Sequence, residues 1–177
     1  MRRPSNVPES IGSEPGTPWT PASFTSLIRG SIRQIWFRWP GRKLALKMAR
    51  EEVPEPKKSG GVKYGVWYRC SECNVLGKEK LGKQDAADLK AWTEECKRAK
   101  KAGVAPLPRP NVPYRVWVDH KEPVVPVDGS DISWDEYIFR TFCPPEDLQI
   151  LCTPCHKKKT YEENRERREN VKKIEME

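Results

Sequence analysis

The chain has 177 residues and a formal net charge of +8, with 36% hydrophobic and 33% charged residues. A core this small for the chain length usually needs a metal or a disulfide to staple it. No run is apolar enough for a membrane span, and the N-terminus lacks the apolar stretch of a secretory signal, so we expect a cytoplasmic protein with no membrane partner. The positive charge indicates a polyanionic partner, for which nucleic acid is the first expectation.

The N-terminal third is predicted to hold a tail and a basic arm. Residues 1–22 are rich in proline, serine and glycine, which predicts a disordered tail. Residues 23–61 form the arm: apolar spacing predicts an amphipathic helix over 24–38 and a shorter helix over 42–52. The stretch 53–61, with prolines and two glycines, is expected to be a linker.

The arm carries an unusual run of charge. From Arg29 to Arg50 there are seven basic residues and no acidic one. A charge run is often only a solvated face, but the lack of any acid favours contact with phosphates. The candidate DNA-binding residues in the arm are Arg29, Arg33, Arg38, Arg42 and Lys43.

The remaining residues, 62–177, are predicted to form one α+β domain with a helical insertion at about 74–113. Alternating and β-prone runs predict strands, and periodic apolar positions between charges predict helices. The expected strands are 62–69, 114–118 and 148–151, and the expected helices are 84–102, 134–141 and 154 to about 170.

Two Cys-x-x-Cys pairs are the strongest local signal in the chain. Six cysteines could form three disulfides in a secreted protein, but without an export signal metal binding is the better interpretation. Paired cysteines at this spacing predict a closed, tetrahedral structural zinc site. Its ligands would be Cys70, Cys73, Cys152 and Cys155. The two other cysteines, Cys96 and Cys143, are expected to be buried thiols.

Three segments then follow in a distinctive order. They are Val118-Asp119-His120-Lys121-Glu122-Pro123-Val124, Glu146-Asp147-Leu148-Gln149-Ile150-Leu151 leading into Cys-x-x-Cys-His156, and Lys157-Lys158-Lys159-Thr160. Together with the paired cysteines, this order resembles the HNH endonucleases, whose active site is a ββα-metal (His-Me finger) unit. The basic N-terminal helices look like those that precede the nuclease in phage-type freestanding members.

The resemblance implies a role for each residue of the motif. His120 would be the general base, and Asp119 and His156 would hold one catalytic divalent ion: Mg²⁺, Mn²⁺ or Ni²⁺. Asp147 stands where the family has an asparagine that ties down the loop and helps to orient the histidine. The lysines 157–159 would grip flanking phosphates of DNA.

At the level of biology, the resemblance implies a homing-type or nicking endonuclease in the cytoplasm of a phage-infected bacterium. One unit has one active site, so cutting both strands would need two units, as in a homodimer, or two successive events.

Other interpretations of these residues remain open. His120 could be a strand-end histidine that bonds to the backbone, Asp119 could cap a turn, and His156 could replace a cysteine at the zinc. Neighbours on an ideal strand also point to opposite faces, so Asp119 and His120 converge only if the strand bends. For the whole chain, the rival hypothesis is a non-catalytic zinc module that binds nucleic acid or protein.

Overall fold

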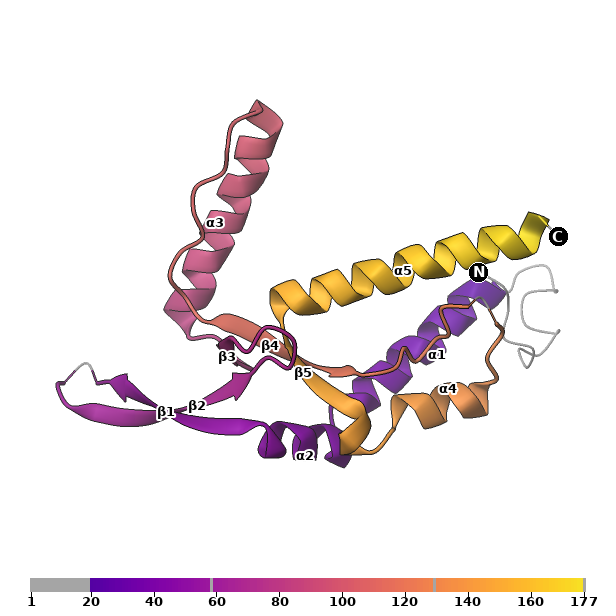
Figure 1. Ribbon diagram of the computed structural model, residues 1–177, viewed down its shortest axis with the longest axis horizontal. Coiled ribbons are helices and arrows are strands. Elements are labelled where there is room, and N and C mark those ends of the chain that lie inside the picture. Colours follow the sequence, from indigo (N-terminus) through magenta and orange to yellow (C-terminus); the bar gives the residue numbers. More distant parts are fainter. Residues whose placement is uncertain (1–19, 58, 129, 177) are drawn as a thin grey trace. The chain divides into compact units, whose positions relative to one another are not determined.

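The computed structural model describes residues 20–57, 59–128 and 130–176, and it is a mixed α+β structure (Figure 1). Its residues group into two units. The first combines the described residues up to Met48 with Val118–Gln149 and those from His156 onward. The second combines Ala49–Trp117 with Ile150–Cys155. The predicted α+β class is confirmed, whereas most of the tail expected at 1–22 lies outside the described residues.

Helices dominate the first unit. Helix α1 (Pro21–Trp36) begins where the Thr20 side chain accepts a hydrogen bond from the Ser23 N–H at 3.2 Å, with proline in its first turn. Helix α2 (Pro40–Met48) ends four residues before its expected boundary. Helix α4 (Trp134–Thr141) has the predicted bounds, because the Ser133 hydroxyl accepts the Glu136 N–H at 3.1 Å.

Two further elements complete the first unit, which includes the second of them from His156 onward. The one-turn 3-10 helix η1 spans Pro145–Asp147, and helix α5 spans Thr153–Met176, which is longer than the predicted 154–170. The core of this unit joins α1 to α4 and to the loop before α4, as their neighbouring ribbons in Figure 1 indicate. Its buried residues are Ile32, Ile132 and Tyr137.

A five-stranded sheet in the order β1-β2-β3-β4-β5 forms the framework of the second unit. The strands are β1 (Arg50–Pro56), β2 (Val62–Arg69), β3 (Leu76–Lys78), β4 (Tyr114–His120) and β5 (Leu148–Cys152). Strands β1, β2 and β3 pair antiparallel in succession, and β3 pairs parallel with β4. The ends of β4 and β5 that carry Val118–His120 and Leu148–Gln149 belong to the first unit.

Strand β1 corrects the expectation of a linker at 53–61. Residues 53–56 pair with β2, with Pro54 opposite Tyr64 and Pro56 opposite Val62. Prolines are tolerated there because β1 is an edge strand. A residue that lacks an N–H group can face the side of β1 that pairs with no other strand. The linker expectation holds only for the turn, where Gly60 and Gly61 adopt φ values of 85° and 81°.

The expected insertion at 74–113 is a crossover connection. It contains β3 and then α3 (Lys83–Ala102), close to the predicted 84–102, which ends in a left-handed Gly103. A parallel pair of strands needs a connection of a dozen or more residues, and α3 with its return segment supplies one. The Trp92 indole N–H donates to the Leu107 carbonyl at 2.8 Å and ties that return segment to α3.

No helix in the ranges that the structure describes combines the length and the apolar character needed to cross a bilayer.

Gly77 of β3 should tolerate no side chain. A Cβ at Gly77 would lie 2.5 Å from the Tyr114 carbonyl oxygen and 2.6 Å from Val116 Cγ1. We therefore expect Gly77→Ala to lower the free energy of unfolding by about 1–3 kcal/mol, measured by urea denaturation of the zinc-loaded chain. Gly30→Ala in α1 is the control, because nothing lies within 4 Å of its added Cβ, and it should stabilise by about 0.5–1 kcal/mol. Equal stability of Gly77→Ala and the unchanged chain would contradict the β3–β4 pairing.

Candidate functional site

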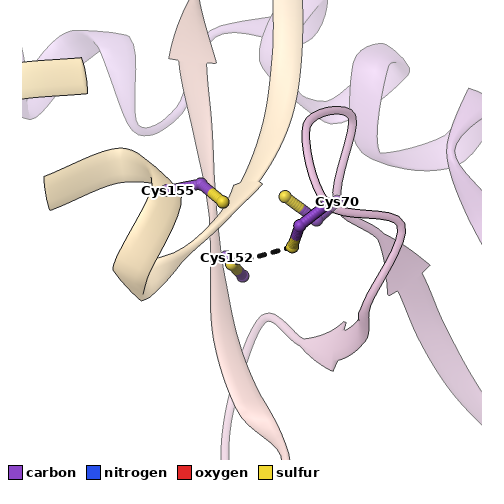
Figure 2. Close-up of side chains that lie close together, drawn as sticks. Cys70, Cys152 and Cys155 are labelled. Atoms are coloured by element: carbon purple, nitrogen blue, oxygen red, sulfur yellow. Dashed lines mark hydrogen bonds between the residues drawn. The ribbon is translucent and has the colours of Figure 1, made fainter. Parts of the chain in front are cut away.

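Four cysteines of the second unit converge on one point (Figure 2). The sulfur atoms of Cys70, Cys73, Cys152 and Cys155 all lie within 4.8 Å of one another, and those of Cys73 and Cys152 are 3.6 Å apart. Sulfurs at about 2.3 Å from one tetrahedral ion would be separated by about 3.8 Å. The predicted group of four is confirmed, and its spacing suits a structural metal such as zinc.

The backbone around the cysteines fixes their directions. Cys70 follows β2, where its N–H donates to the Val75 carbonyl at 3.0 Å and its own carbonyl accepts the Asn74 N–H at 3.0 Å. Asn74 has a φ of 58°, which closes this tight knuckle. Cys152 ends β5 and Cys155 lies in the first turn of α5, so two bends of the chain face each other.

The negative charges that the four thiolates would carry also favour a bound cation. Burial opposes ionisation of Cys70, but backbone N–H groups of Cys152, Cys73 and Glu72 outweigh it and lower its pKa to about 7. At Cys152 and Cys155, burial and the neighbouring sulfurs raise the pKa. Four thiolates this close repel one another, so they ionise together only when a divalent ion compensates their charge. The four sulfurs complete a tetrahedral set without His156.

In the first unit, the motif residues Asp119, His120 and His156 gather at the end of β4 and on α5. The Nε2 atom of His156 lies 4.0 Å from Oδ1 of Asp119. Two donor atoms that each bind one ion at about 2.1 Å lie between about 3 and 4.2 Å apart, so this pair fits a shared divalent ion. No other group of three or more ligating side chains, apart from the four cysteines, was found among the described residues.

The imidazole of His120 has a defined orientation. Its Nε2 lies 2.9 Å from the carbonyl oxygen of Thr141 at the end of α4. Because a carbonyl oxygen only accepts, the neutral ring must donate from Nε2, which leaves the lone pair on Nδ1. The backbone bond weighed as an alternative role for His120 is therefore present, and it assigns Nδ1 as the atom able to accept a proton.

The backbone of His120 is held as well. Its carbonyl oxygen accepts from Nζ of Lys159 at 2.9 Å and from Nε2 of Gln149 at 3.2 Å. The next residue, Lys121, donates its N–H to the Asp147 carbonyl at 2.8 Å. Asp147 thus contacts the loop after β4 through its backbone, and its carboxylate charge adds to burial in raising the pKa of the Cys143 thiol.

Lys159 is less exposed than Lys157 and Lys158. Its ammonium contacts Asp119 Oδ2 at 3.2 Å and forms a short ion pair with Glu163, and only 23% of its side chain is exposed. Burial lowers its pKa, but the bond to Glu163 and the charges of Asp119 and Glu163 more than compensate, so the pKa is raised. Lys159 therefore braces the site, whereas Lys157 and Lys158 are exposed.

The candidate DNA-binding residues of the basic arm also differ in their exposure. Arg33, Arg38 and Lys43 are exposed on or beside α1 and α2. The guanidinium of Arg29 instead lies 5.4 Å from the Tyr137 ring centroid, and that of Arg42 lies 5.4 Å from the Trp36 ring centroid. Arg29 and Arg42 thus help to pack the first unit, whereas phosphate contact by the three exposed residues stays a prediction.

Sequence reasoning missed two residues of this site. Glu163 could have been found, because it lies one helical turn after Lys159. The Thr141 carbonyl had no signal in the sequence, because any residue there supplies a carbonyl.

Comparisons of the chain with protein-family models, with curated proteins and with solved structures found no match.

Removing one of the four sulfurs should release the metal. We expect the chain to bind about one Zn²⁺, measured by a colorimetric chelator after unfolding, and Cys73→Ser to lose most of it because a hydroxyl is a poor zinc ligand. Cys96→Ser is the matched control, because Cys96 lies on α3 outside the group of four. Full zinc content in Cys73→Ser would contradict this site.

Proposed function

We propose that this protein is a metal-dependent DNA endonuclease of the HNH type. The observation that carries the proposal is one arrangement at the end of β4. There, the bond to Thr141 orients the His120 ring and leaves its lone pair on Nδ1. The preceding residue, Asp119, has its Oδ1 atom 4.0 Å from Nε2 of His156. A purely structural zinc module has no need of an oriented base beside a carboxylate–imidazole pair.

The chemistry follows from the groups present. Hydrolysis of a phosphodiester needs a base to take a proton from the attacking water, and His120 Nδ1 supplies it. A divalent ion held by Asp119 and His156 (Mg²⁺, Mn²⁺ or Ni²⁺) would stabilise the negative charge on the leaving oxygen. Lys159 contacts both the Asp119 carboxylate and the His120 carbonyl oxygen, and so ties these two neighbouring residues to α5.

The charge of the chain supports DNA as the substrate. The net charge is +8, and exposed basic residues occur in both the arm and the first turns of α5. These residues are Arg33, Arg38, Lys43, Lys157 and Lys158. With one site per chain, a monomer would nick one strand, and a homodimer would cut both. A phage homing or nicking role is what the family resemblance adds to this proposal.

Loss of the base should abolish cleavage without loss of fold. We expect His120→Ala to lower the rate of plasmid nicking in Mg²⁺ or Mn²⁺ by about 10²–10⁴-fold, because general-base catalysis contributes that much. His156→Ala should also lose activity while its zinc content stays near that of the unchanged chain.

Two outcomes would decide against this assignment. Equal nicking by His120→Ala would end the role of His120, and zinc loss in His156→Ala would move His156 into the structural site. A chain that retards DNA on a gel but cuts none with any of the three ions would favour the rival, a zinc-containing binding module.

Binding to DNA should depend on the exposed arm. We expect the double variant Arg33→Gln, Lys43→Gln to weaken binding to any duplex sequence and to reduce the slope of log K against log salt by about 2, one for each lost phosphate contact. Fluorescence anisotropy at several salt concentrations measures it. Lys90→Gln on α3 is a control of equal charge change per residue, and an unchanged slope in the double variant would contradict the predicted docking face.

A further inference from the structure

We propose that Trp36 of α1 is a positioning residue for the imidazole of His120. The inference rests on the proposed nuclease function and adds a residue to its site that the HNH resemblance did not include. It makes α1 a part of the catalytic apparatus as well as a candidate DNA-binding arm.

The Trp36 ring and the His120 ring are neighbours whose planes are tilted. Their centroids are 5.3 Å apart and their planes meet at 33°. This separation and tilt lie within the range in which aromatic pairs attract each other. The indole therefore limits the space in which the imidazole can rotate, which a hydrogen bond at one ring atom alone does not do.

The burial of Trp36 supports a specific role for the contacts that its ring makes. Only 9% of the residue is exposed, and its indole N–H is buried without a hydrogen-bond partner among the described residues. Leaving a buried donor unpaired costs about 1–3 kcal/mol. A leucine or phenylalanine would fill an apolar position without that cost. The indole ring contacts both the His120 ring and the Arg42 guanidinium, and these two contacts explain an indole here better than filling space does.

The same helix also supports the second restraint on His120. The Thr141 carbonyl that accepts from Nε2 belongs to a residue only 5% exposed, whose hydroxyl donates to the Tyr137 carbonyl at 2.7 Å. Tyr137 in turn packs in the core cluster with Ile32. Ile32 and Trp36 are four residues apart, so they share one face of α1.

That face thus acts on the imidazole in two ways. Through Ile32 and α4 it supports the carbonyl at the Nε2 edge, and through Trp36 it contacts the imidazole ring. With the Nε2 edge bonded and the ring packed against the indole, the directions open to Nδ1 are restricted. The sequence 28–36 therefore contributes to orienting the base, although none of its side chains needs to touch the reacting phosphate.

The experiment compares Trp36→Leu, Trp36→Phe and Trp39→Phe in the full zinc-loaded chain. Trp39 is the matched control, because its ring lies 5.2 Å from Phe142 and its N–H donates to Cys143, with no ring contact to His120. The chain has only two histidines, so ring signals in a ¹H–¹⁵N spectrum are assigned by a single His156→Ala variant.

We expect Trp36→Leu to lower the single-turnover nicking rate by about 10²-fold with unchanged DNA affinity, because misplacing a catalytic group by about 1 Å costs that much. The His120 ring protons should lose the upfield shift caused by the indole, while zinc content stays the same. Trp36→Phe should recover much of the rate, and Trp39→Phe should leave rate and ring signals unchanged.

The outcomes separate this inference from the proposed function. If the unchanged chain nicks DNA and Trp36→Leu nicks equally fast, the inference is wrong and the nuclease assignment stands. If the unchanged chain nicks no DNA, the nuclease assignment fails and the positioning role of Trp36 in catalysis by His120 fails with it. If Trp36→Leu loses its zinc or its fold, Trp36→Phe decides instead. His120 ring signals at the same chemical shifts in Trp36→Phe as in the unchanged chain would then overturn the inference.

Discussion

The candidate site depends on how the chain is held at the last residue of β4. In an extended strand, successive side chains point to opposite faces and the carbonyls point sideways. The local geometry of β4 alone therefore does not direct the His120 ring toward the Asp119 carboxylate. At His120 the carbonyl oxygen accepts from Lys159 of α5 and Gln149 of β5, and the ring donates to the end of α4. Two helices and a strand that follow β4 in the chain thus restrain one residue, as the proposed general base would need in order to act without a cost of reorganisation.

The second unit solves a different physical problem. Its buried residues around Cys70, Leu151 and Cys152 are few, and a two-stranded ribbon such as β1–β2 is marginal on its own. Four sulfurs gathered this closely make a poor apolar core but a good zinc site. The metal would supply the cohesion that the small core lacks, and the ion would be structural because four thiolates leave no coordination position for chemistry.

The sequence predicted best those features that depend on local spacing. The two Cys-x-x-Cys pairs predicted the group of four, and Ser133 predicted the start of α4, because capping and ligand spacing are set within a few residues. Strand β1 was missed because its prolines argue for a linker unless the strand is known to be an edge. Strand β3 was missed because three residues carry no periodic signal.

The candidate site was predicted in part. The motif supplied Asp119, His120 and His156, but three consecutive lysines looked alike. Only the phase of α5 separates them: Lys159 is three residues after His156 and lies on its side of the helix, whereas Lys157 and Lys158 turn away. Trp36 could not be predicted, since its contact with His120 joins residues 84 positions apart through the packing of α1.

The most direct test of this account is where a paramagnetic ion binds. Mn²⁺ titrated into the zinc-loaded chain should broaden the ring signals of His156 at one equivalent, and the Asp119→Asn variant should lose this effect because half of the ligand pair is gone. Broadening that is equally strong in Asp119→Asn, or none at His156 at any Mn²⁺ concentration that leaves the zinc in place, would contradict a catalytic ion held by this carboxylate and this imidazole.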